Sequence, residues 1–202
     1  MKTILLAGLF SVSILSVTAQ ARRAHAHDDV DVAFGIKGGL NIANLHVENA
    51  GSSTADAKAS FHAGGLAHIH ITKSFALQPE LMYSNQGYKY ELSNTTTRLN
   101  LHYLNLPVLA QFMVGQGFRI ESGPQLGFLL AARQKTNNVS LDVKNNFKTV
   151  DFGWAFGLGY VTPSGFGVDA RYNVGISSIN KASAAVNNRV FQAGVFYQFN
   201  NH

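Results

Sequence analysis

Six charged residues of both signs stand in segments that are otherwise apolar or built of small residues. They are Lys37, Glu80, Arg119, Glu121, Asp169 and Arg171. Isolated charges are costly to bury, so such side chains must neutralise one another as ion pairs if they share a narrow interior. We therefore predict a structural network of ion pairs, with the lining of a narrow passive pore as the alternative.

Histidines offer a second chemistry, because imidazoles at positions i and i+2 of a strand lie on one face and can approach one metal ion. His62, His68 and His70 share such a face, and His25 and His27 form a similar pair near the N-terminus. No cysteine and no suitably spaced carboxylate completes either set. We predict no metal site, and packing in an interior or at its rim for the first three histidines.

Catalysis by hydrolysis would need a nucleophile, a base within hydrogen-bond reach and a third group that orients the base. Serines, histidines and aspartates occur in the polar stretches, but no recognisable motif joins them. The Gly157-Leu-Gly159 sequence lies in an alternating segment and opens no helix, so it cannot present the amide-lined phosphate site of a dinucleotide fold. We predict no catalytic residue, no cofactor and no enzyme activity.

Composition limits the partners. The net charge is +5, but the basic residues are scattered and only Arg22 and Arg23 are adjacent, so we expect no nucleic-acid binding. Charged residues make up 13% of the chain, whereas soluble domains typically contain about 25%. The low charge suits a protein with lipid on one side and water or packed polar groups on the other.

The N-terminus has the pattern of an export signal. Lys2 gives a positive start, residues 4–17 are uncharged and apolar, and small residues follow up to Ala21. We predict a signal peptide over residues 1–21 that is cleaved on export, a flexible lead-in over 22–32, and one barrel domain over 33–199.

Beyond the signal, apolar residues recur with period two, which indicates β-strands. The clearest case is residues 166–176, where large apolar side chains alternate with glycine, asparagine and charged residues. The same test predicts eight strands, at residues 33–43, 61–71, 75–90, 99–114, 118–131, 151–160, 166–176 and 191–199. Eight is an even number and gives a small closed barrel with both ends on one side of a membrane.

The connections alternate in length. Polar stretches at residues 44–60, 93–98, 133–148 and 180–188 alternate with tight turns at 72–74, 115–117 and 162–165. Short periplasmic turns and longer outer loops are typical of bacterial outer-membrane barrels. The fold predicted is all-β: an eight-stranded antiparallel up-and-down transmembrane β-barrel.

A soluble periplasmic barrel of the lipocalin type is the alternative, because the same alternation can be inverted, with apolar residues inside. The face that carries the large residues is almost free of charge, and the opposite face combines glycine with charge. A soluble barrel would seldom devote its exterior to so much glycine, so the pattern favours the membrane.

Four segments follow one another along the strands: residues 35–41 (GIKGGLN), 77–83 (LQPELMY), 103–109 (YLNLPVL) and 123–127 (GPQLG). In this order they resemble the porin-like, PorT-type outer-membrane β-barrels of Bacteroidota. The resemblance implies a location in the bacterial outer membrane and contact with its lipid. It further implies recognition by the outer-membrane assembly machinery through the last strand, which ends at Phe199, and it raises the prospect of an envelope or secretion-system protein partner.

The function predicted is a non-catalytic, envelope structural or adhesion-type role that acts through the outer loops. A narrow passive pore is the second hypothesis. It would show conductance in planar bilayers that changes when Arg119 or Glu121 is neutralised.

Overall fold

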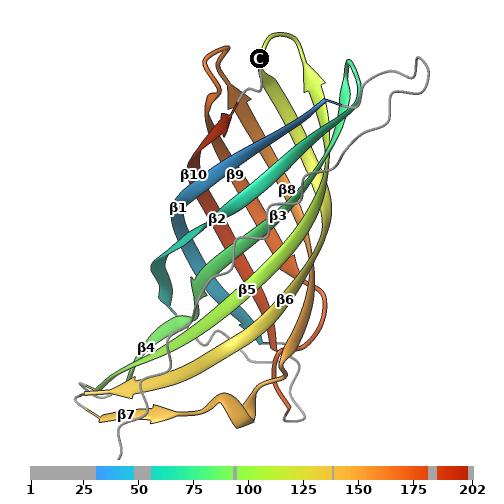
Figure 1. Cartoon of the computed structure of the whole chain (residues 1–202). Helices are drawn as coiled ribbons and strands as arrows, with labels where there is room; N and C mark the ends of the chain where they lie inside the picture. Colours follow the sequence, from blue (N-terminus) through green and yellow to red (C-terminus); the bar gives the residue numbers. More distant parts are fainter. Residues whose placement is uncertain (1–30, 48–55, 93–94, 138, 182–185, 200–202) are drawn as a thin grey trace, which may run out of the picture.

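The computed structural model describes residues 31–47, 56–92, 95–137, 139–181 and 186–199, and these residues form antiparallel β-structure (Figure 1). The elements are β1 (Val32–Val47), β2 (Asp56–Thr72), β3 (Phe75–Gln86), β4 (Tyr88–Leu92), β5 (Thr95–Val114), β6 (Phe118–Thr136), β7 (Val139–Asp142), the short 3-10 helix η1 (Lys144–Asn146), β8 (Val150–Val161), β9 (Phe166–Gly175) and β10 (Val186–Phe199). No helix among these residues has the length and the apolar character needed to cross a membrane. The predicted signal peptide, and the lead-in as far as residue 30, lie outside the described residues.

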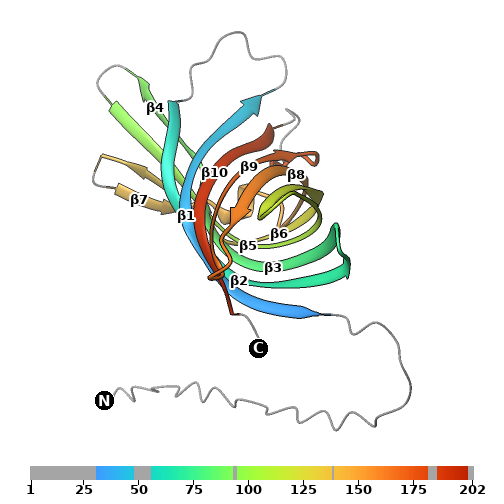
Figure 2. The ribbon, with the colours of Figure 1, turned by 90° about the horizontal axis from the view of Figure 1, so that it is seen from above.

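Eight of the strands pair in a closed ring. The order is β1, β2, β3, β5, β6, β8, β9 and β10, each antiparallel to the next. β10 then pairs with β1, from Phe34 opposite Phe199 to Val47 opposite Val186. Figure 2 shows the strands wrapped around a common axis. The predicted all-β, eight-stranded antiparallel fold is confirmed.

The two ends of the ring differ. Consecutive strands meet in tight turns after β2, β5 and β8, at the end where β1 begins and β10 stops. Figure 1 places the last residues of β10 at this end and β4 and β7 at the other. The predicted alternation of short and long connections is therefore present in the described residues.

The strands differ from the prediction at the end that carries the long connections. Residues 75–90 were expected as one strand but are divided into β3 and β4 at Gly87, whose φ of 126° is in the left-handed region. A Cβ there would lie 2.1 Å from the backbone oxygen of Leu99, so the break requires glycine.

Two of the stretches that were expected as loops are largely ordered. β5 begins at Thr95, β6 continues to Thr136, and β7 and η1 occupy much of residues 133–148. β4, β5, β6 and β7 pair in that order beyond the ring, so they form a projecting sheet (Figure 1). Alternation of apolar and polar residues cannot reveal β7, because all four of its residues are exposed. It also misses residues 95–98 of β5, because the buried position there is the polar Thr97.

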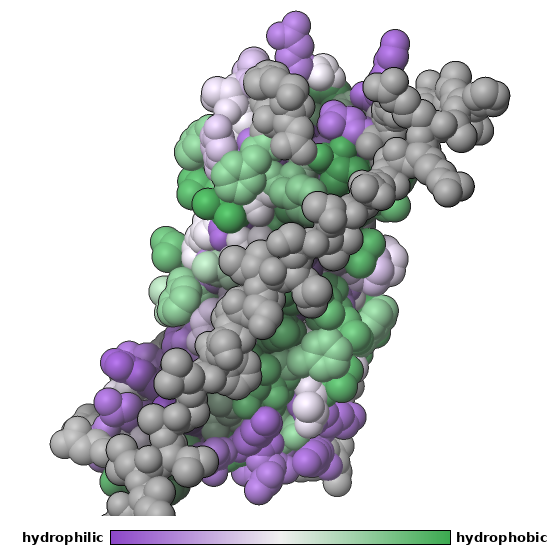
Figure 3. All heavy atoms as spheres, in the orientation of Figure 1, coloured by the Kyte–Doolittle hydropathy of each residue, from purple (hydrophilic) through white to green (hydrophobic). Residues whose placement is uncertain are grey.

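The side chains are sorted in the sense expected for a membrane barrel. On β9, Phe166, Val168 and Tyr172 are exposed, whereas Asp169 and Arg171 are buried. Figure 3 shows an apolar surface around the middle of the molecule with hydrophilic residues toward its ends. A lipocalin-type barrel would have the opposite orientation, so that alternative is excluded.

Phe196 is an aromatic residue on the otherwise polar face of β10. It is 7% exposed and stands opposite Gly167 of β9. A Cβ on Gly167 would lie 2.2 Å from the Cζ atom of Phe196, so the ring fills the space that the glycine leaves. This contact packs β9 against β10 on the inner face of the barrel.

We predict that Gly167→Ala lowers the free energy of unfolding by about 1–3 kcal/mol, because overpacking forces the ring to move. Combining it with Phe196→Ala should cost less than the sum of the two single changes, since the added methyl then enters the vacated space. Denaturant unfolding in detergent micelles measures both. Gly38→Ala is the matched control, because its nearest neighbour atom would lie at an ordinary 3.7 Å. Additive losses in the double variant would contradict the packing described.

Candidate functional site

The barrel interior collects the six charged residues singled out from the sequence. Each is at most 8% exposed, and they come from four strands: Lys37 of β1, Glu80 of β3, Arg119 and Glu121 of β6, and Asp169 and Arg171 of β9. Residues separated by as many as 134 positions are thus brought to one interior by ring closure.

Arg171 is the centre of this interior. Its Nη1 and Nη2 atoms donate to the two carboxylate oxygens of Glu80 at 2.8 and 2.9 Å, a bidentate pair. Its Nε atom donates to Oε1 of Glu121 at 2.9 Å. Fork-shaped pairing of this kind is the strongest that arginine makes with carboxylates.

Lys37 extends the network to a third carboxylate. Its Nζ atom donates to Oδ2 of Asp169 and lies 3.9 Å from Oε1 of Glu80. Oδ2 of Asp169 is in turn 4.0 Å from Nη2 of Arg171. Two cations and three carboxylates therefore form one connected ionic network: Lys37, Arg171, Glu80, Glu121 and Asp169.

Neutral side chains complete the coordination of these carboxylates. Nε2 of Gln78 donates to Oε1 of Glu80, and Nε2 of Gln111 donates to Oε2 of Glu121, each at 2.8 Å. A Cβ on Gly157 would lie 2.6 Å from Oε1 of Glu121. The glycine in the middle of β8 therefore makes room for the network, which gives it a steric role.

Arg119 is buried but lies outside the ionic network. Its Nη2 atom donates to Oε1 of Gln198 at 3.0 Å, its Nη1 atom is 3.5 Å from Nδ1 of His68, and its guanidinium carbon is 5.9 Å from the centre of the Phe196 ring. No ion pair with a carboxylate is formed by Arg119 among the described residues. Its charge makes the six residues neutral as a set.

A layer of amides adjoins the network and was not singled out from the sequence. Nδ2 of Asn41 donates to Oγ of Ser84 at 3.0 Å, and Nε2 of Gln192 donates to Oδ1 of Asn41 at 3.0 Å. Nδ2 of Asn173 donates to Oε1 of Gln192 at 2.8 Å. These residues occupy inward positions of their strands, so the alternation of inward and outward residues along each strand could have identified them.

The histidines of β2 have separate surroundings. Nδ1 of His62 is 2.7 Å from Oδ1 of Asn41, and His68 is fully buried beside Arg119. The rings of His68 and His70 are 4.5 Å apart and nearly perpendicular. Among the described residues, no three metal-binding side chains are grouped closely enough to hold an ion.

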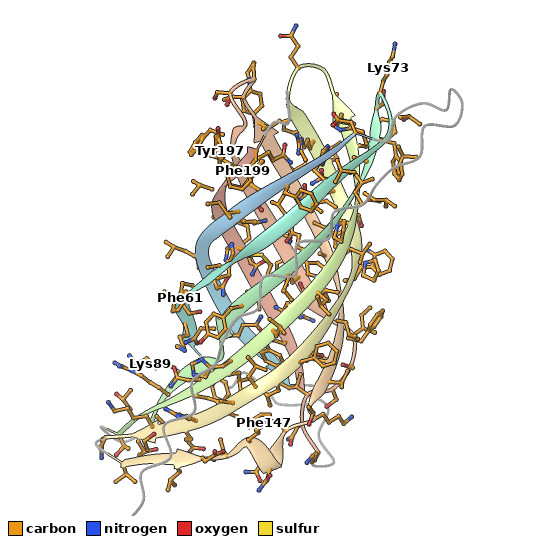
Figure 4. The ribbon with its side chains drawn as sticks, viewed as in Figure 1. Phe61, Lys73, Lys89, Phe147, Tyr197 and Phe199 are labelled. Carbon is orange, nitrogen blue, oxygen red and sulfur yellow. The ribbon has the colours of Figure 1, made fainter. Side chains whose placement is uncertain are left out.

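An apolar cluster lies toward the end of the barrel that carries the projecting sheet. Leu99, Leu101, Tyr103, Leu129, Ala132 and Ile179 are buried in it, and Phe147 packs against it (Figure 4). The backbone N–H of Lys148 donates to the oxygen of Ile179 at 2.8 Å. The connections after β6 and β9 are therefore tied together.

A closed ring with large apolar residues outside and ion pairs inside defines a transmembrane β-barrel. The family model of the outer membrane protein beta-barrel domain matches residues 18–181, and the chain belongs to this family. Its location is the bacterial outer membrane.

Two solved structures have the same fold. Neisserial surface protein A aligns with a TM-score of 0.51 and 18% identity over 84% of this chain and 99% of its own. The attachment invasion locus protein Ail of Yersinia pestis aligns with a TM-score of 0.50 and 13% identity over 83% of this chain and 98% of its own. No curated protein sequence matches the chain.

We predict that Arg171→Met lowers the free energy of unfolding by about 3–5 kcal/mol, because it leaves Glu80 and Glu121 buried without their main partner. Adding Glu80→Met should restore part of that loss, since the pair is then replaced by apolar side chains. Denaturant unfolding, with heat-modifiable gel migration as the measure of folding, tests both variants. Lys73→Met in an exposed turn (Figure 4) is the control and should change stability by less than about 0.5 kcal/mol. Equal decreases in the free energy of unfolding for Arg171→Met and Lys73→Met would contradict a stabilising role for the ionic network.

Proposed function

We propose that this protein is a small, non-catalytic outer-membrane barrel of the porin-like, PorT type, which acts on partners through its projecting sheet. The projecting sheet consists of β4, β7 and the outer ends of β5 and β6. Two observations support the proposal: an interior filled by paired charges, and an outer strand with an unpaired edge.

The filled interior favours a closed lumen over a passive pore. Arg171, Glu80 and Glu121 are each at most 4% exposed and bind one another across the barrel. Interiors of eight-stranded barrels are just wide enough for their side chains. The cavity near the amide layer, lined by residues such as Gln86, Asn173 and Asn188, has about 10 Å³, which is room for one water molecule.

The unpaired edge of β7 is the observation that best supports a role in binding another protein. Within the described residues β7 pairs with β6 alone, so its other side presents free backbone N–H and C=O groups. Val139 and Leu141 are 60% and 58% exposed on this strand. Exposed edges of this kind accept an extended strand from another chain, with main-chain hydrogen bonds providing affinity.

The kind of partner follows from this mode of binding. It is a protein that offers an extended segment with alternate apolar residues, such as a component of an envelope or secretion assembly. A separate contact, with the outer-membrane assembly machinery, would use β10, whose last residue Phe199 is exposed.

In-cell photo-crosslinking tests the interaction role. A benzophenone amino acid at Leu141 should yield a protein adduct of discrete mass, whereas the same group at Leu158, which is exposed on the side of the ring, should yield none. Val139→Lys should abolish the adduct, because a lysine on an edge strand opposes the addition of another strand. An adduct that survives Val139→Lys, or an equal adduct from Leu158, would contradict the proposal. Stepwise conductance in planar bilayers that changes on neutralising Glu121 would favour the pore instead.

A further inference from the structure

A row of cations crosses the projecting sheet. Lys89 of β4 stands opposite Arg98 of β5, and Arg98 stands opposite Lys135 of β6. Directly opposed residues of an antiparallel pair have Cβ atoms about 5 Å apart, and like charges at that spacing destabilise the sheet. The direct opposition of Arg98 and Lys135 therefore favours the binding of an anion between them.

The row lies on the outward face of the sheet. Thr97, Leu99 and Leu101 of β5 are buried, so Arg98 between them points away from the interior. The same face of β5 carries Leu106 and Val108 farther along, at 38% and 45% exposure, where the ring contacts lipid. Figure 4 shows Lys89 on the outside of the sheet.

Neither Arg98 nor Lys135 forms an ion pair with a carboxylate in the described part of the chain. Three acidic residues border the row in the strand register: Asp56 opposite Lys89, Glu91 opposite Thr96, and Asp142 opposite Arg133.

A hollow accompanies these two cations. It has about 170 Å³ and is lined by Thr96, Arg98, Lys135 and Asn137. The guanidinium, the ammonium and the amide are groups that donate hydrogen bonds to a phosphate, with arginine matching two oxygens and lysine acting as a point charge.

The short distance between this row and the lipid-facing residues favours a lipid as the source of the anion. Lys135 follows the exposed Leu130 by five residues on β6, which is roughly 17 Å along a strand and about 12 Å in height at a tilt near 45°. Figure 1 shows β5 and β6 running obliquely in this region. Long basic side chains can reach back from there to the lipid headgroups.

We propose that the hollow between Arg98 and Lys135 binds the phosphate of an anionic lipid headgroup in the outer leaflet. The site anchors the projecting sheet to the membrane surface, and it is separate from the free edge of β7. Charge complementarity and the continuity of this face with the lipid-facing surface determine the choice of a lipid.

The test measures lipid binding to the folded full chain in uncharged maltoside micelles by native mass spectrometry. Phosphatidic acid, whose headgroup is a phosphate monoester, should bind more tightly than phosphatidylcholine. A basic residue near an anionic surface contributes about a five-fold change in affinity, so Arg98→Gln with Lys135→Gln should weaken phosphatidic acid binding roughly 25-fold. Heat-modifiable migration verifies that the variant is folded.

The matched control removes two exposed lysines elsewhere, by Lys73→Gln with Lys148→Gln, and should leave the affinity unchanged. Equal affinity for the two lipids, or equal losses in the two double variants, would overturn the site. Displacement of phosphatidic acid by an excess of inorganic phosphate would overturn the lipid assignment and leave a site for a soluble phosphate.

Discussion

The hydrogen bonding of β1 to β10 is the interaction on which the remaining structure depends. A bilayer offers no water to unpaired backbone groups, so a sheet can cross it only when its first and last strands join. The long register from Phe34–Phe199 to Val47–Val186 meets this requirement. Closure also creates the interior, because the inward residues of eight strands then face one another instead of solvent.

That interior determines which residues the strands can carry. Arg171 of β9 binds Glu80 of β3 and Glu121 of β6. Each of these two carboxylates also accepts a hydrogen bond from a glutamine side-chain amide. Bulky neighbours would prevent these contacts, which accounts for Gly157 on β8 beside the network and Gly167 opposite Phe196. The charges inside and the glycines around them are therefore parts of one packing arrangement, while the outside is left to large apolar residues.

Much of this could be predicted from the sequence where one face of a strand meets lipid and the other meets the interior. The alternation of apolar and polar residues predicted β8, β9 and β10, and it indicated the six charged residues of the interior. It could not separate Arg119 from the other five, because its partners Gln198 and His68 come from distant strands. It also missed β7, whose residues are all exposed, and the first residues of β5, where the buried side chain is the polar Thr97. The burial of Ile179 depends on contacts between two connections, which no local pattern encodes.

Site-directed disulfide formation between the first and last strands tests the closed ring most directly. The chain has no cysteine, and Leu40 of β1 stands opposite Ala193 of β10. Oxidation of Leu40→Cys with Ala193→Cys in isolated outer membranes should give an intramolecular disulfide, seen as faster migration of the boiled, unreduced protein. The offset pair Leu40→Cys with Tyr197→Cys should not, because four residues separate the two positions by roughly 13 Å. Failure of the first pair to form an intramolecular disulfide, or formation only of disulfide-linked dimers, would contradict a ring closed by β1 and β10.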